Sequence, residues 1–195
     1  AATTATTLIE SFGAKSIVFT GVAGGVGVGV NVGDVVVASD FVQHDMDASP
    51  LFSRYEVPLY GRSRFPCDAA LTAILLEAAN EGLTWACGHF EDERSGHRRR
   101  VHQGLIASGD RFVSDLADAA GLVDALQQFG LNPLAVEMEG AAVAQVCHDY
   151  ALPFAAVRTV SDRADSQAHV DFSEFVNQVA SPYALVMIRH LMKMR

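Results

Sequence analysis

Two carboxylates, Glu139 and Asp162, occupy matching places in one strand-helix-strand pattern. Residues 134–136 are predicted to form a short buried strand, residues 141–150 a helix, and residues 154–160 a second strand. Glu139 follows the first strand and Asp162 follows the second. Two acids at one site can divide their roles, one holding a proton as a general acid and the other remaining ionised as a hydrogen-bond acceptor.

The elements around these acids determine whether they can act together. A strand-helix-strand pattern of this length predicts parallel neighbouring strands joined by a right-handed crossover. Both acids are then expected at one edge of the sheet, one strand spacing apart or a little more, where open α/β sheets bind ligands. The alternative is that Glu139 caps the start of the helix and Asp162 lies in an ordinary polar turn. Spacing alone leaves both interpretations open.

Arg158 stands inside the otherwise apolar second strand. A buried guanidinium needs a carboxylate partner, and Glu137 or Glu139 is the expected one. Arg158 is therefore a candidate site residue that orients an acid and keeps it ionised. A purely structural ion pair is equally compatible with the sequence.

Residues 21–29 are glycine-rich and are predicted to form a loop between strands at 16–20 and 32–38. A dinucleotide-binding loop would need a glycine at Val30 and a helix after the loop, and no lysine follows to make a P-loop. The loop has little side-chain bulk, so backbone can approach a ligand closely, although a plain tight connection fits as well. Phe112 follows a predicted strand at 101–107, where its ring could stack on a purine or belong to the core.

Composition limits the classes of function. The 195 residues suit one domain, residues 1–195, with a sizeable core. The net charge of −9 makes nucleic acid and anionic membranes poor partners. Three scattered cysteines predict a reducing, cytoplasmic location, and no apolar run reaches the ~20 residues that span a bilayer. Because the chain opens on helix-like residues rather than on a strand or a methionine, we expect that an N-terminal segment is missing.

Three motifs together carry a family resemblance: VEMEGAAVAQVC from 136, VRTVSDRAD from 157 and HVDFSEF from 169. They resemble the purine nucleoside phosphorylase/uridine phosphorylase family, and most closely its hydrolytic branch, the 5′-methylthioadenosine/S-adenosylhomocysteine nucleosidases. The resemblance covers nearly the whole chain. It implies an α/β fold with a mixed, mostly parallel sheet flanked by helices, and cleavage of the N-ribosidic bond to give adenine and a 5-thio-substituted ribose.

The resemblance also implies roles for particular residues. Asp162, held by Ser161, would protonate adenine N7, and Glu139 would accept hydrogen bonds from the ribose hydroxyls, with no metal and no organic cofactor. The remaining residues expected against base and sugar are Val22, Ala23, Gly24, Phe112, Val113, Met138 and Phe172. A homodimer is implied, in which Leu51, Phe52 and Pro58 wall the partner's pocket for the 5′-substituent.

Two alternatives remain. Phosphorolysis would need an arginine and a hydroxyl for phosphate, and the matching positions, Phe19 and Val22, offer neither, which favours water as the nucleophile. Hydrolytic members often carry serine where Val22 stands, and they have a glutamate after their first strand that no residue here matches. A nucleoside-binding module without turnover is therefore the second alternative.

Overall fold

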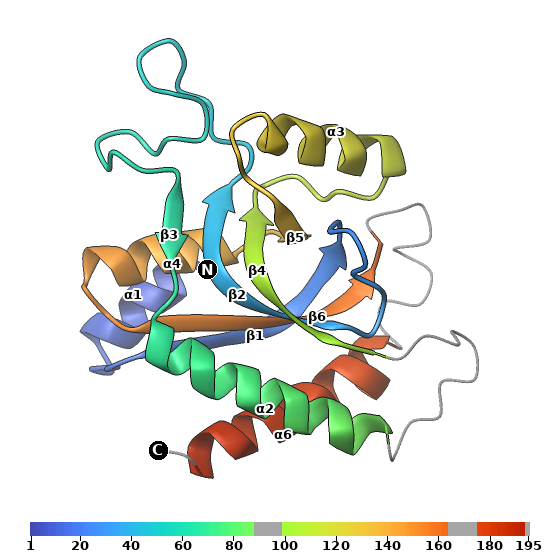
Figure 1. The fold of residues 1–195 in the computed structure, drawn as a ribbon. Coiled ribbons are helices and arrows are strands. Elements are labelled where there is room, and N and C mark those ends of the chain that lie inside the picture. The colour runs from blue at the N-terminus through green and yellow to red at the C-terminus, as the bar shows by residue number, and fades with distance from the viewer. Residues whose placement is uncertain (88–98, 164–174, 194–195) are drawn as a thin grey trace.

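The computed structural model describes residues 1–87, 99–163 and 175–193 and is drawn as a ribbon in Figure 1. Its helices are α1 (Ala2–Glu10), α2 (Ala69–Cys87), α3 (Leu116–Gln127), α4 (Gly140–Asp149) and α6 (Ser181–Lys193), with a π-helical turn η1 (Val176–Ala180) before the last. Its strands are β1 (Ile17–Gly25), β2 (Val35–Gln43), β3 (Arg64–Pro66), β4 (Val101–Ser108), β5 (Pro133–Glu137) and β6 (Phe154–Asp162).

The strands form one mixed sheet that curves back on itself. Their order is β3-β2-β4-β5-β1-β6, and β6 also pairs with β2, so β2, β4, β5, β1 and β6 make a closed ring. The long ladders, β2 with β4 and β1 with β6, are parallel. Short antiparallel ladders join β1 to β5 and β2 to β6. The predicted fold, a mixed and mostly parallel sheet flanked by helices, is confirmed.

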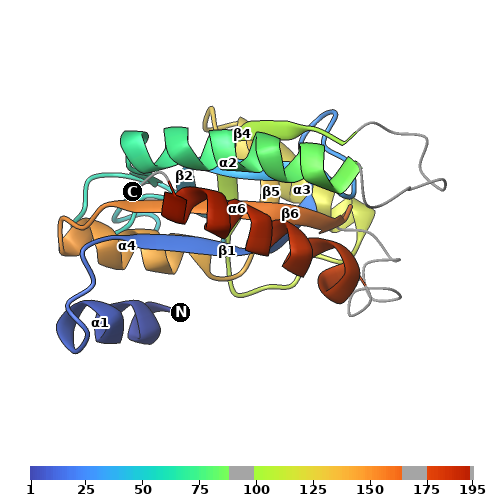
Figure 2. The ribbon, with the colours of Figure 1, turned by 90° about the horizontal axis from the view of Figure 1, so that it is seen from below.

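Alternating residues of β2 explain why helices cover both of its faces. Val35 and Val37 cluster with α2 and α6, whereas Val36 and Ala38 cluster with residues of α4. A strand that is buried on both faces carries a continuous apolar run, as Val35-Val-Val-Ala38 does. Figures 1 and 2 show α2 and α6 side by side on one face, with α4 and α1 packed together on the other.

The strands that carry the two acids are not neighbours, so the predicted parallel pairing of β5 with β6 is wrong. Strand β1 lies between them, parallel to β6 and antiparallel to β5. A strand-helix-strand pattern gives the length of the connection between two strands. It does not tell whether an earlier strand of the chain lies between them in the sheet. Gly24 of β1 pairs with Val136 on one side and with Asp162 on the other, so a single strand separates the two acid-bearing ends.

Two local predictions also need correction. The glycine segment is not all loop, because β1 runs on through Gly25, and residues 26–34 then connect it to β2. The apolar types at residues 83–88 also predict a strand from the sequence, but residues 83–87 belong to the end of α2, and residue 88 lies outside the described residues. The reason is packing, since Leu83 extends the buried stripe formed by Leu71, Leu75 and Ala79.

Helix α3 was not predicted from the sequence. Its start carries a clear signal, because the Asp115 carboxylate accepts hydrogen bonds from the backbone N–H groups of Ala117 (2.8 Å) and Asp118 (3.2 Å). Within the described residues, none of the helices is both long enough and apolar enough to cross a membrane.

Candidate active site

A cavity of about 160 Å³ lies where the ends of β1, β5 and β6 meet the segment after β4. Both acids of the predicted pair, Glu139 and Asp162, line it. The full lining is Val22, Ala23, Gly24, Arg111, Phe112, Val113, Val136, Glu137, Met138, Glu139, Ser161 and Asp162. Four segments that are far apart in sequence therefore supply one site.

Most of the residues predicted to contact base and sugar line this cavity, namely Val22, Ala23, Gly24, Phe112, Val113, Met138 and Ser161. Arg158 does not line it and is 1% exposed. Phe172 lies outside the described residues. Leu51, Phe52 and Pro58 lie in the segment between β2 and β3, away from the cavity lining. The contacts of all these residues with a ligand stay predictions.

The Asp162 carboxyl is held by its neighbours at the end of β6. The Ser161 hydroxyl donates a hydrogen bond to Asp162 Oδ2 at 2.7 Å and lies 3.4 Å from the backbone oxygen of Ala23. A register shift in the β1–β6 ladder pairs Gly24 with Asp162. The Ser161 hydroxyl is thus hydrogen-bonded to the acid, and its role in holding Asp162 for proton transfer stays a prediction.

Glu139 and Glu137 leave the same strand in different environments. Glu139 is exposed, and its side chain makes no capping hydrogen bond to α4. Glu137 is the residue that caps α4, because each of its carboxylate oxygens accepts a hydrogen bond from Gly140 N at 2.9 Å. The alternative in which Glu139 caps the helix is therefore wrong, and its carboxylate is left at the cavity.

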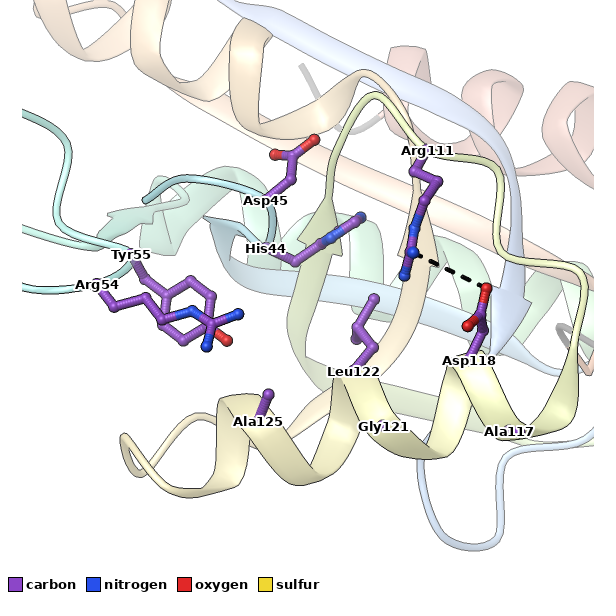
Figure 3. Close-up of a pocket in the computed structure, with 10 residues that line it drawn as sticks. All are labelled: His44, Asp45, Arg54, Tyr55, Arg111, Ala117, Asp118, Gly121, Leu122 and Ala125. Atoms are coloured by element: carbon purple, nitrogen blue, oxygen red, sulfur yellow. Dashed lines mark ion pairs between the residues drawn. The ribbon is translucent and has the colours of Figure 1, made fainter. Parts of the chain in front are cut away.

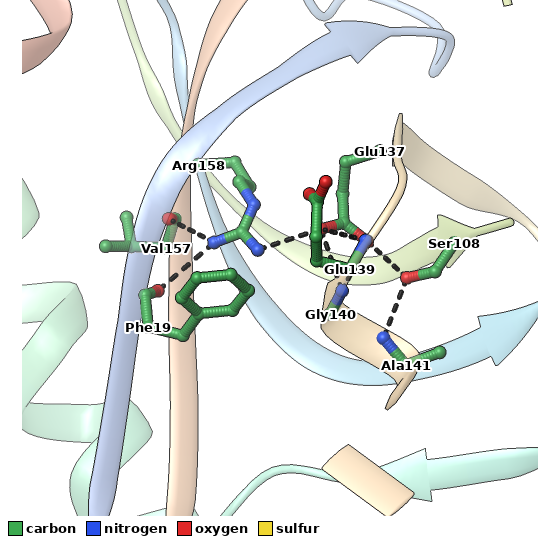
Figure 4. A network of polar contacts seen from close by, with 8 residues as sticks. All are labelled: Phe19, Ser108, Glu137, Glu139, Gly140, Ala141, Val157 and Arg158. Carbon is green, nitrogen blue, oxygen red and sulfur yellow. Dashed lines mark hydrogen bonds and ion pairs between the residues drawn. The ribbon is translucent and has the colours of Figure 1, made fainter. Parts of the chain in front are cut away.

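Arg158 pairs with Glu137 and not with Glu139 (Figure 4). Its Nη2 lies 2.8 Å from Glu137 Oε2, and the side chains are 1% and 2% exposed. Its Nη1 donates to the backbone oxygens of Phe19 (3.2 Å) and Val157 (3.1 Å), and the guanidinium lies 4.1 Å from the centroid of the Phe19 ring. A buried charge pair of this kind is stable only when its remaining donors and acceptors are also engaged.

Ser108, at the end of β4, completes the network and was missed by the sequence analysis. Its hydroxyl donates to Glu137 Oε1 and accepts a hydrogen bond from Ala141 N at 2.8 Å. The polar cluster therefore joins β6, β5, β4 and the first turn of α4 just beneath the cavity. A serine at a strand end gives no pattern that would reveal this contact in the sequence.

A larger cavity of about 450 Å³ lies elsewhere, between α3 and the segment after β2 (Figure 3). Arg111 lines both cavities, and here its Nη1 lies 3.9 Å from Asp118. His44 also lines it and is 8% exposed; burial, reinforced by Arg111 and opposed by Asp45, lowers the pKa of His44 below 6.5. The smaller cavity is the candidate site because it alone of these two contains the predicted acid pair.

The fold is an α/β sheet flanked by helices, and the acid pair lies at the ends of β5 and β6. Both features are those of a nucleoside-phosphorylase-like protein. The family model described as "Phosphorylase superfamily" matches residues 1–192. The chain belongs to this superfamily.

Several proteins that are similar to this chain are nucleosidases. The 5′-methylthioadenosine/S-adenosylhomocysteine nucleosidase of Bacillus cereus is 37% identical over 181 residues, which are 92% of this chain and 70% of that protein. The solved S-adenosylhomocysteine nucleosidase of Streptococcus pyogenes, in complex with 5-methylthiotubericidin, is 32% identical with a TM-score of 0.80, covering 100% of this chain and 74% of that one. The Neisseria meningitidis 5′-methylthioadenosine/S-adenosylhomocysteine nucleosidase, in complex with methylthio-immucillin-A, is 36% identical with a TM-score of 0.79, covering 100% and 76%.

Proposed function

We propose that this chain hydrolyses the N-ribosidic bond of 5′-methylthioadenosine and S-adenosylhomocysteine, releasing adenine and a 5-thio-substituted ribose. The observation that carries the proposal is the convergence of Glu139 and Asp162 on one small cavity. The likeness to nucleosidases, at 37% identity over 92% of the chain, gives the substrate class.

The two acids suit the two charges that develop as the bond breaks. Cleaving C1′–N9 builds negative charge on adenine and positive charge on the ribose. Asp162 gives a proton to N7, so adenine departs as a neutral base. Glu139 accepts hydrogen bonds from the ribose hydroxyls and stabilises the oxocarbenium-like centre. Water then adds to C1′ and gives up a proton to solvent, from which Asp162 is reprotonated.

The rest of the lining suits a purine riboside. Phe112 and Met138, 48% and 39% exposed, offer apolar surface to base and sugar, and the segment 22–24 allows close approach of backbone. Phe172, which lies outside the described residues, is proposed from the family resemblance alone to receive the 5′-alkylthio group. In a homodimer the segment that carries Leu51, Phe52 and Pro58 completes this pocket for the partner. The reaction belongs to cytoplasmic nucleoside catabolism and methionine salvage.

Water is favoured over phosphate as the nucleophile. A phosphate site needs an arginine whose donors are available. The guanidinium of Arg158 is buried and bonded to Glu137, Phe19 and Val157. Among the described residues that line the cavity, Arg111 is the sole cation, and the carboxyl groups of Glu139 and Asp162 line the same space.

Adenine release from 5′-methylthioadenosine, measured with and without inorganic phosphate, tests the proposal. We expect equal rates in both conditions, with the free thio-substituted ribose as the second product. Release that requires phosphate would make the chain a phosphorylase. Tight binding of 5′-methylthioadenosine without release would make it a binding module.

A further inference from the structure

The Ser108 hydroxyl connects the Glu137 side chain of β5 to the first turn of α4 (Figure 4). The hydroxyl donates to the Glu137 carboxylate and accepts from Ala141 N, and the residue is 3% exposed. Its own backbone is fixed, because its carbonyl oxygen accepts from His44 N at 2.8 Å and the next residue, Gly109, donates to the Glu137 carbonyl at 3.2 Å. Ser108 is therefore a rigid attachment point for the first turn of α4.

That turn is what places Glu139 at the cavity. The Glu139 side chain is exposed and makes no capping bond, so the position of its carboxylate depends on the backbone at residues 138–141. Three backbone N–H groups of this turn donate hydrogen bonds to side chains. Those of Glu139 and Gly140 donate to the Glu137 carboxylate, and that of Ala141 donates to the Ser108 hydroxyl. On the side of β2 the turn is pressed against Phe41, since a Cβ on Gly140 would lie 2.2 Å from the Phe41 ring.

We propose that Ser108 is a positioning residue for the ribose-binding carboxylate of Glu139; the proposal rests on the hydrolytic function above. A serine hydroxyl donates one hydrogen bond and accepts another at the same time, which the Glu137 carboxylate and the Ala141 N–H both require. Alanine at this position would leave Ala141 N without its acceptor and Glu137 without one of its donors. The first turn of α4, which carries Glu139, would then lose its attachment to β4, whereas the residues that line the cavity would be unchanged.

A double-mutant cycle separates positioning from a general structural effect. Ser108→Ala is expected to lower kcat for 5′-methylthioadenosine by about tenfold or more with a smaller change in KM, because small misplacements of a reacting group weaken the transition state. In a Glu139→Gln background the same change is expected to alter kcat by less than about twofold, since the group being positioned has already been altered. The matched control is Thr72→Val, which removes a buried hydroxyl that has no hydrogen-bond partner among the described residues and leaves turnover as it was.

Two outcomes overturn the proposal: Ser108→Ala with the kcat of the unchanged protein, or an equal loss of kcat with and without Glu139→Gln. Circular dichroism checks folding, and Ser108→Cys replaces Ser108→Ala in the cycle should the alanine variant not fold.

A measurement of binding affinity tests the positioning role of Ser108 separately from the proposed function. If the unchanged protein releases no adenine, the function fails, and affinity is measured for 5′-methylthiotubercidin, a 7-deaza riboside without the N7 acceptor, and for its 2′,3′-dideoxy counterpart. Positioning stands if Ser108→Ala weakens the riboside about tenfold and the dideoxy compound far less. It falls if both weaken alike or if the unchanged protein binds neither.

Discussion

Glu137 and Glu139 stand in the same turn at the end of β5, and their surroundings differ completely. Glu137 is buried against Arg158, Ser108 and the start of α4, whereas Glu139 is exposed at the cavity. The sequence indicated an acid pair and a carboxylate partner for Arg158 but did not distinguish the two glutamates. The distinction arises from tertiary packing, because the path of the chain leaving β5 decides which carboxylate turns inward.

The pH dependence of stability is tested at His44. Its pKa in the folded chain is lowered below 6.5, chiefly by burial. The contribution of neutral His44 to stability is therefore complete above pH 6.5 and is lost as the pH falls below it, because the unfolded chain takes up the proton more readily. The free energy of unfolding in urea, compared at about pH 7.5 and about pH 5.5, should fall more for the unchanged protein than for His44→Gln. Equal falls in both proteins would show that His44 carries no part of the effect.

Packing of α4 against β2 is tested by two glycines in helices. A Cβ on Gly140 would lie 2.2 Å from the Phe41 ring, whereas a Cβ on Gly121 in α3 would meet nothing within 4 Å. Gly140→Ala should lower the free energy of unfolding by about 1–3 kcal/mol because the core is overpacked. The matched control, Gly121→Ala, should raise it by about 0.4–1 kcal/mol because alanine has less freedom in the unfolded chain. Urea unfolding measures both, and equal shifts in the two variants would contradict the packing described here.

Helices and strands were largely predictable from the sequence where a local apolar pattern marks them. They were less predictable where tertiary packing determines the structure. Strands were predicted from the sequence where β2, β4, β5 and β6 lie, and the apolar run Val35-Val-Val-Ala38 of β2 is typical of a strand buried on both faces. The end of α2 was misassigned because Leu83 and its neighbours suit a strand by type and a helix by spacing. The insertion of β1 between β5 and β6 had no local signal at all, since it depends on pairing across the whole chain.

At the scale of the molecule, the segment between β2 and β3 extends away from the sheet (Figure 1). Leu51 and Leu59 within it are 85% and 93% exposed. Exposed apolar side chains grouped on one segment are typical of an interface with another chain, and we expect a second copy of this chain to cover them. Sedimentation should show a dimer, and Leu51→Asp should weaken it and lower turnover. A monomer with full activity would contradict the shared pocket.

The proposed reaction depends most on Asp162 protonating the base while Glu139 binds the sugar. The direct measurement is adenine release by Asp162→Asn beside its affinity for 5′-methylthiotubercidin. We predict that turnover of 5′-methylthioadenosine falls by about 10²–10⁴-fold, the usual contribution of a general acid, while the affinity changes little. Adenine release at the rate of the unchanged protein would contradict the account.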